Sequence, residues 1–202
     1  MSAAIINYGM GNVASVQKAL SYLNVENIVT ENFNEIDQAK FIILPGVGSY
    51  NQGISNLQKN GLFDFLSDQV LKKKKPFLGI CLGMQLIATK GTEPFEIAGL
   101  NWIGGEVIKM ELKEKRVPHL GWNTIIPKET KYFSSLKNLD FYFIHSYHFK
   151  VTDEQYISSI VNYGIDMVSS VQKENIFATQ FHPEKSQETG LKLLKNFFEL
   201  NA

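Results

Sequence analysis

The only cysteine of the chain, Cys81, lies in the sequence Gly-Ile-Cys-Leu-Gly at residues 79–83. The apolar residues before it predict a short buried strand, and the residues after it predict the start of a helix. A reactive side chain between glycines at such a turn is typical of a nucleophile elbow, because glycines let the backbone turn sharply and crowd the nucleophile. Free N–H groups at a helix start favour a thiolate. This turn alone supports a catalytic nucleophile and a buried structural cysteine about equally.

A catalytic cysteine needs a base to move protons, and that base needs a group to orient it. His182 fits this role because it lies in the sequence Gln-Phe-His-Pro-Glu at residues 180–184. In an extended segment, His182 and Glu184 would project to the same side, and a carboxylate beside an imidazole stabilises the imidazolium form. A His-x-Glu pair alone is often a surface salt bridge. Together with the cysteine turn, it predicts a catalytic triad of Cys81, His182 and Glu184.

The sequence Pro-Gly-Val-Gly at residues 45–48 directly follows a fully apolar run. Ligands bind at the carboxyl ends of strands in open α/β sheets, and acyl transfer needs backbone N–H groups that face the developing oxyanion. We expect the N–H of Leu82 and an N–H of Val47 or Gly48 to supply this oxyanion hole. The alternative interpretation is an ordinary Pro-Gly turn.

Strands alternate with helices in the first half of the chain, which predicts an α/β fold with an open, mostly parallel sheet flanked by helices. The predicted strands are residues 3–7, 26–30, 41–44 and 75–80, and helical spacing of apolar residues occurs at residues 13–23 and 54–70.

The second half of the chain is dominated by strand patterns with short turns, at residues 104–126 and 141–180. We expect these strands to pair antiparallel and to extend or flank the first sheet. A terminal helix is predicted for residues 190–200. Because no linker or repeat interrupts the chain, we expect one domain over residues 1–202.

The charges of the chain balance, with 20 Lys and Arg against 20 Asp and Glu. This balance gives no electrostatic reason to expect a nucleic-acid or membrane partner, and no apolar run approaches the ~18–20 residues of a membrane span. One cysteine forms no internal disulfide, and the first seven residues lack the features of a secretory signal. We therefore expect a cytoplasmic protein.

Metal and nucleotide cofactors are not expected. The single cysteine and the four histidines show no paired ligand spacing. The glycines at positions 9 and 11 do not complete the three-glycine fingerprint of a dinucleotide site.

The cysteine turn at residues 79–85 and the segment at residues 181–184 resemble the class I (triad) glutamine amidotransferase family. Further segments, which span essentially the whole chain, are similar to the glutaminase subunits of imidazole glycerol phosphate synthases. These segments are residues 8–12, 45–48, 117–123, 143–147 and 180–186.

The resemblance implies that Cys81 attacks the side-chain amide of L-glutamine and forms a thioester, which water then hydrolyses to glutamate. His182 would transfer the protons, and Glu184 would orient His182. The residues implied to hold glutamine are Gly48, Gln85, Ser146 and Tyr147.

The resemblance also implies a partner. Glutaminases of this kind pass ammonia to a separate (β/α)8-barrel cyclase subunit, which forms imidazole glycerol phosphate and aminoimidazole carboxamide ribotide in histidine biosynthesis. A barrel of about 250 residues does not fit into this chain, so we expect a heterodimer. The residues implied to face the partner are Asn12, Trp122, Tyr142 and Lys185. An exposed tryptophan is a good interface anchor, although tryptophans also lie in protein cores.

Two departures from the family pattern leave the ammonia acceptor open. Asn7 replaces a usual acidic residue, and residues 88–96 replace a usual serine-rich acidic stretch. A paralogous glutaminase that supplies ammonia for amidino-modified surface sugars therefore remains an alternative. Two further alternatives are a hydrolase of γ-glutamyl peptides and a non-catalytic binding subunit. For the glutaminase, we expect low activity until the liganded partner binds, with a peptide near Val47 as the switch.

Overall fold

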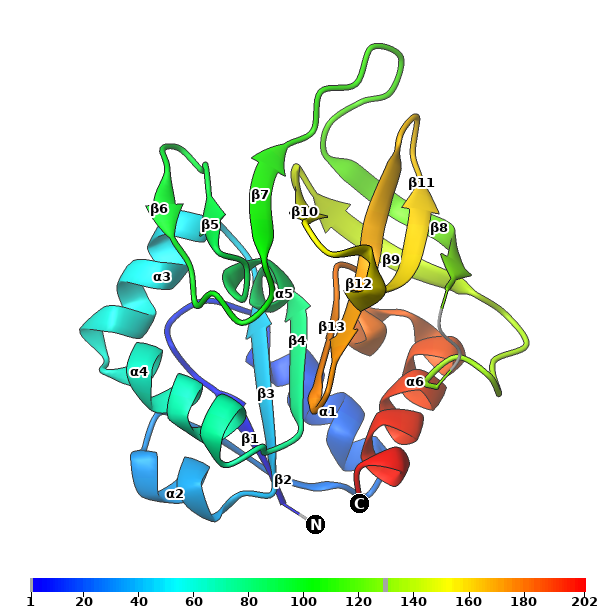
Figure 1. Cartoon of the computed structure of the whole chain (residues 1–202). Helices are drawn as coiled ribbons and strands as arrows, with labels where there is room; N and C mark the ends of the chain where they lie inside the picture. The colour runs from blue at the N-terminus through cyan, green and yellow to red at the C-terminus, as the bar shows by residue number, and fades with distance from the viewer. Residues whose placement is uncertain (1, 129–130) are drawn as a thin grey trace.

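The computed structural model of the chain describes residues 2–128 and 131–202. These residues form a nine-stranded mixed sheet and a smaller four-stranded sheet (Figure 1). Five strands of the large sheet run parallel and lie in the order β2, β1, β3, β4 and β13, and the antiparallel strands β12, β11, β8 and β9 continue the same sheet. The predicted α/β fold with antiparallel additions is confirmed.

The strands agree closely with the apolar runs of the sequence. Their bounds are β1 (Ser2–Ile6), β2 (Glu26–Thr30), β3 (Phe41–Gly46), β4 (Phe77–Cys81), β8 (His119–Pro127), β9 (Asp140–His145), β11 (Ile157–Asn162), β12 (Asp166–Lys173) and β13 (Ile176–Thr179). In β3, β4 and β13 all residues are buried, because helices cover both faces of central parallel strands.

Alternate side chains of each central strand enter two different cores. In β1, Ala4 and Ile6 belong to one core and Ala3 and Ile5 to the other, as the two-residue period of a strand requires. The first core packs under α2 (Phe33–Gln38), α3 (Tyr50–Lys59), α4 (Leu62–Ser67), the π-helical turn η1 (Asp68–Lys72) and α5 (Leu82–Leu86), and the second under α1 (Val13–Tyr22) and α6 (Gln187–Leu200). Figure 1 shows α3 and α4 on the opposite side of β3 and β4 from α6.

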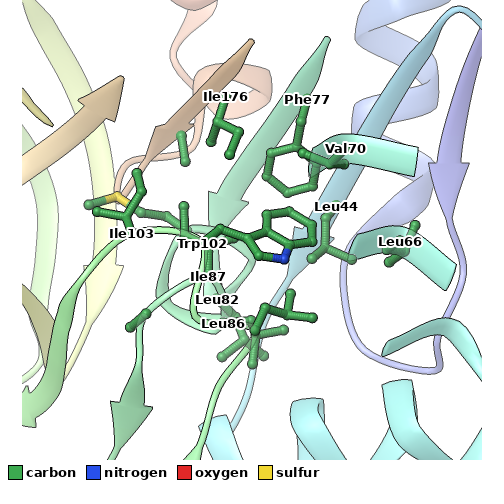
Figure 2. Close-up of a cluster of buried hydrophobic side chains, with 14 of the residues drawn as sticks. Leu44, Leu66, Val70, Phe77, Leu82, Leu86, Ile87, Trp102, Ile103 and Ile176 are labelled. Carbon is green, nitrogen blue, oxygen red and sulfur yellow. The ribbon is translucent and has the colours of Figure 1, made fainter. Parts of the chain in front are cut away.

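Trp102 anchors the first core beneath the cysteine turn (Figure 2). Its ring packs edge-on against Phe77, with 4.9 Å between ring centroids. Its Nε1–H donates to the hydroxyl of Ser67 at 3.0 Å, so the polar atom of this buried ring is satisfied. Leu82, Leu86 and Ile87 belong to the same cluster, and the helix that follows Cys81 is thereby held against β3 and β4.

The helix that was predicted to start after Cys81 is short. It ends at Leu86, and the amide N–H groups of Leu100 and Trp102 donate to the carbonyls of Leu86 and Ile87. The loop at residues 100–102 thus supplies donors to carbonyl groups that the end of the helix would otherwise leave without partners.

The smaller sheet contains β10 (Tyr147–Val151), β7 (Gly105–Lys109), β5 (Lys90–Gly91) and β6 (Ile97–Ala98). Two of its strands have only two residues each, which is too short for a hydrophobic period to predict. Two 3-10 turns, η2 (Glu154–Tyr156) and η3 (Pro183–Lys185), complete the described elements.

β13 differs from the expectation for the second half of the chain. It pairs antiparallel with β12 but parallel with β4, where Ala178 lies opposite Gly79. A strand buried on both faces is suited to this central place. The carboxyl ends of β4 and β13 therefore lie at the same edge of the sheet. Within the described part of the chain, no helix is both long and apolar enough to cross a membrane.

Candidate active site

Cys81 is the last residue of β4 and the residue directly before α5. Its backbone has φ +55° and ψ −106°, a conformation that a non-glycine residue adopts only when its surroundings impose it. The surroundings here are tight. A Cβ on Gly83 would overlap the carbonyl oxygen of Leu44, and a Cβ on Gly79 would lie 2.8 Å from the carbonyl oxygen of Gly83. The glycines on both sides therefore permit the strained turn that presents Cys81.

His182 follows β13, so the parallel pairing of β13 with β4 brings His182 to the same sheet edge as Cys81. Its Nδ1 atom lies 2.8 Å from Oε1 of Glu184, and each of the two side chains is only 2% exposed. The structure therefore brings the three predicted triad residues to one end of two neighbouring strands.

The His182–Glu184 contact forms across the 3-10 turn η3. The expectation of an extended segment at these residues is therefore wrong. The amide of Lys185 and the hydroxyl of Ser186 both donate to the carbonyl oxygen of His182. These bonds close the turn, and Pro183 at its first position has the backbone angle that such a turn needs. The carboxylate reaches the imidazole because the chain folds back on itself.

The two buried neighbours of His182 control its charge. Burial alone would lower the pKa of His182, but attraction to the Cys81 thiolate and the bond to Glu184 outweigh burial and raise the pKa to about 10. The buried Nε2 atom has no hydrogen-bond partner of ordinary length among the described residues, and its interaction with the Cys81 sulfur, both Coulombic and hydrogen-bonding, contributes to the raised pKa. Catalytic hydrogen bonds often tighten only when substrate binds.

The sulfur of Cys81 has two further polar neighbours. The Nε2 atom of Gln180 lies 3.6 Å from it, and the carbonyl oxygen of Ile144 lies 3.8 Å from it. Gln180 belongs to the segment at residues 180–186, but nothing in its spacing predicts a contact with a sulfur 99 residues away.

A cavity of about 530 Å³ opens beside Cys81. Five of the predicted residues line it with Cys81, namely Val47, Gly48, Ser146, Tyr147 and Lys185. It is also lined by residues that the sequence did not predict, namely Ser49, Glu93, Pro118, Ile144 and His145.

Of the residues predicted for the oxyanion hole and for glutamine binding, two do not line this cavity. The Leu82 side chain belongs to the first core, so only its backbone N–H is suited to an oxyanion hole. The Gln85 side chain is buried, and its Nε2–H groups donate to the carbonyl oxygen of Tyr147 at 3.0 Å and to Oε1 of Gln180 at 2.9 Å. Neither of these bonds involves the side-chain oxygen Oε1 of Gln85.

The segment that contains Val47 and Gly48 has a conformation suited to glycine. Gly48 has φ +107°, and a Cβ on it would lie 2.8 Å from the terminal methyl of Met10. Such positive φ angles are available to glycine at little cost. The predicted role of this segment in an oxyanion hole stays a prediction.

Glu93 is a charged residue of the cavity that the sequence analysis did not select. Its Oε2 atom accepts a hydrogen bond from the amide of Tyr50 at 2.9 Å. A carboxylate fixed in this way at a cavity wall suits a cationic group of a ligand, such as the α-ammonium of an amino acid.

Three of the four predicted partner residues form one exposed patch. Trp122 is 49% exposed and meets Tyr142 edge-on, with 6.1 Å between centroids. The ammonium of Lys185 lies 6.0 Å from the centroid of Tyr142. The side chain of Asn12 caps α1 through the amide of Ser15. The exposure of Trp122 excludes the interpretation of it as a core residue.

No group of three or more Asp, Glu, His or Cys in residues 2–128 and 131–202 is arranged to hold a metal ion.

Comparison with known proteins identifies the family. The family model described as glutamine amidotransferase class-I matches residues 4–200 of the chain. The chain belongs to this family. The resemblance drawn from the sequence is thereby confirmed, and this amidotransferase also has full-length relatives.

One relative is imidazole glycerol phosphate synthase subunit HisH 1 of Campylobacter jejuni (strain RM1221), which is 46% identical over 98% of this chain and 99% of the relative. Another is imidazole glycerol phosphate synthase subunit HisH of Caldanaerobacter subterraneus subsp. tengcongensis, which is 43% identical over 97% of each chain.

Solved structures share the fold of this amidotransferase. A crystal structure of a glutamine amidotransferase has a TM-score of 0.77 at 19% identity and covers 98% of each chain. The structure of PurLQS from Thermotoga maritima has a TM-score of 0.79 at 17% identity and covers 100% of this chain and 99% of that one. At these identities the likeness concerns the fold alone.

Proposed function

We propose that this amidotransferase hydrolyses L-glutamine to L-glutamate and ammonia through a thioester on Cys81, with His182 and Glu184 as the other members of the triad. The ammonia is supplied to a separate cyclase subunit that forms imidazole glycerol phosphate and aminoimidazole carboxamide ribotide in histidine biosynthesis. The observation that carries the proposal is the buried His182–Glu184 pair at 2.8 Å, placed by β13 beside a strained cysteine at a cavity.

In the first step, the Cys81 thiolate attacks the side-chain amide carbon of glutamine. The C–N bond then breaks, and His182 gives its proton to the leaving nitrogen, so that ammonia departs and a glutamyl thioester remains. The raised pKa of His182, about 10, keeps this proton in place before the attack. Glu184 holds the imidazole by its Nδ1–H and leaves Nε2 for the transfer.

In the second step, neutral His182 takes a proton from water, and the resulting hydroxide attacks the thioester carbon. The C–S bond breaks, glutamate leaves, and the thiolate and the imidazolium are restored. The sum is glutamine plus water giving glutamate plus ammonia. In this proposal, backbone N–H groups of Leu82 and of Val47 or Gly48 stabilise the negative oxygen of each tetrahedral intermediate.

The cavity supplies contacts for the rest of glutamine. Gly48, Ser146 and Tyr147 line it beside Cys81, and the buried Gln85 supports it by donating to the backbone carbonyl oxygen of Tyr147. The Glu93 carboxylate is suited to the α-ammonium group.

The histidine pathway is favoured over the surface-sugar acceptor by the relatives, which are named as subunits of imidazole glycerol phosphate synthase at 43–46% identity over nearly the whole chain. The partner is accordingly a (β/α)8-barrel cyclase bound as a heterodimer, and the exposed patch of Trp122, Tyr142 and Lys185 is suited to contact it. Such an enzyme acts in the cytoplasm.

The test measures glutamate release from glutamine by the chain alone and with the cyclase of the same organism plus its ribotide ligand. We expect strong stimulation by the liganded cyclase, and no detectable glutamate from a Cys81→Ala variant whose circular dichroism matches the wild type. Retained activity in that variant would refute the triad. Unstimulated turnover by a chain that binds the cyclase would refute the coupling to the histidine pathway.

A further inference from the structure

Two buried histidines outside the proposed triad form a pair between β8 and β9. His119 and His145 lie opposite each other in the register of the two strands, and Nδ1 of His119 is 3.1 Å from Nε2 of His145. His119 is stacked on Phe143 and on Tyr163, with ring centroids 4.6 Å and 4.0 Å away. The position of this imidazole is therefore fixed from both faces.

The donors and acceptors around this pair allow only one assignment of hydrogen-bond directions. The Nδ1 atom of His145 lies 2.8 Å from the carbonyl oxygen of Tyr147, which only accepts, so this Nδ1 carries the proton. The Nε2 atom of neutral His145 then accepts from Nδ1–H of His119, and Nε2 of His119 accepts from the amide of Asn123 at 3.3 Å. Burial lowers the pKa of His145 to about 3 and that of His119 to about 4, in agreement with two neutral rings.

The same carbonyl oxygen of Tyr147 connects this pair to the nucleophile. It accepts a second hydrogen bond, from Nε2 of Gln85 at 3.0 Å. The Gln85 atom that faces this carbonyl oxygen must be a donor and is therefore the amide nitrogen Nε2. The Gln180 atom 2.9 Å from Gln85 Nε2 must then be an acceptor, so it is the amide oxygen Oε1. The other end of the Gln180 amide is then Nε2–H, and it faces the Cys81 sulfur at 3.6 Å. The amide orientation at the sulfur thus follows from the carbonyl of Tyr147.

We propose that Gln180 is a catalytic hydrogen-bond donor to the Cys81 thiolate and that the His119–His145 pair is a positioning unit which holds Gln180 in this orientation through Tyr147 O and Gln85. The proposal rests on the proposed function in taking Cys81 as the nucleophile. A donor to sulfur favours the thiolate over the thiol, and a buried donor with no freedom to rotate does so without a net charge. The series of hydrogen bonds that leads to Cys81 begins at Asn123, which is next to the exposed Trp122 on β8.

The experiment uses the fact that the chain has one cysteine, so that alkylation reports a single thiol. The second-order rate of Cys81 alkylation by iodoacetamide is measured in the full chain from pH 5 to pH 10. Gln180→Met keeps the length of the side chain and removes the donor. We expect the midpoint of its pH profile to rise by about one unit, which corresponds to an about tenfold weaker preference for the thiolate.

The positioning role is tested by a pair of variants at His119, which does not line the cavity. His119→Leu removes the donor to His145 and is expected to shift the alkylation profile in the same direction as Gln180→Met. His119→Asn retains a donor near the position of Nδ1 and is expected to restore most of the wild-type profile. The control is His148→Leu, a histidine on β10 outside this set of bonds, for which we expect an alkylation rate within about twofold of wild type.

The outcomes separate this proposal from the proposed function. An unchanged profile for Gln180→Met would overturn the donor role, and equal profiles for His119→Leu and His119→Asn would overturn the positioning role. Should His119→Leu fail to fold, His119→Ala takes its place as the variant that lacks the donor. In steady-state assays with the cyclase, Gln180→Met should lower kcat with little change in KM, because Gln180 does not line the cavity. Shifted alkylation without any wild-type glutaminase activity would overturn the proposed function alone.

Discussion

The Nδ1 atom of His182 lies 2.8 Å from Oε1 of Glu184, and both side chains are withdrawn almost completely from water. The second carboxylate oxygen, Oε2, has no hydrogen-bond partner among the described residues. The carboxylate therefore directs its one strong bond to the imidazole. Removing either member of such a buried pair would leave the charge of the other uncompensated.

Replacing Glu184 with glutamine tests this dependence. Glu184→Gln keeps the shape of the side chain but removes the charge that helps to hold a proton on His182. We expect kcat for glutamine hydrolysis to fall by about 10²–10⁴-fold, the usual contribution of a positioned acid–base group. Steady-state kinetics with the liganded cyclase measure this, with circular dichroism as the control for folding. A kcat within threefold of wild type would show that the carboxylate is dispensable.

The neutral His119 predicts a loss of stability in mild acid. The pKa of His119 is about 4 in the folded chain against 6.5 for the free side chain. Between these two pH values, His119 is protonated in the unfolded state but neutral in the folded state. Its contribution to the free energy of unfolding is complete above pH 6.5 and is lost as the pH falls toward 4.

We expect the free energy of unfolding in urea to drop between pH 7 and pH 5 by about 2 kcal/mol more in the wild type than in His119→Asn. The comparison uses the difference between the two pH values within each protein, so the direct effect of the substitution on packing cancels. Equal drops in both proteins would mean that His119 is protonated in the folded chain.

Gly83 is expected to tolerate no side chain, because a Cβ there would overlap the carbonyl oxygen of Leu44 on β3. Gly83→Ala should lower the free energy of unfolding by about 2–4 kcal/mol and should also displace Cys81. The matched control is Gly104→Ala, whose added Cβ would meet nothing closer than 3.9 Å. That variant should stay within about 0.5 kcal/mol of wild type. Urea unfolding measures both, and similar losses in both would disprove the steric argument.

Trp122 is expected to carry much of the binding to the cyclase. Trp122→Ala should weaken the affinity by about 1–3 kcal/mol, that is, by roughly fivefold to 160-fold, because exposed aromatic anchors dominate interfaces. The stability of the free chain should change little, since about half of the side chain is already in water. Calorimetric titration measures the affinity, and Tyr22→Ala, which removes a 74% exposed ring on α1, is the control. Equal affinities for both variants would place the interface elsewhere.

The local features of the site could be predicted from the sequence. The glycines around Cys81, the apolar run before it and the His-Pro-Glu segment each express a requirement that a few neighbouring residues satisfy by themselves. A sharp turn needs glycine, and a buried strand needs an unbroken apolar run. The fold class, which the structure confirms, and the proposed triad both followed from such requirements.

Other features were decided by the tertiary structure. Gln180 meets a sulfur 99 residues away, His119 meets a ring 26 residues away, and Glu93 reaches a cavity that distant segments enclose. These contacts depend on the order and register of strands, above all on the parallel pairing of β13 with β4. The period of a strand says which side chains face a core, whereas the neighbour across the sheet is selected by the packing of the whole chain. The sequence by itself therefore determined which groups could do the chemistry, and only the folded sheet decided which polar side chains surround them.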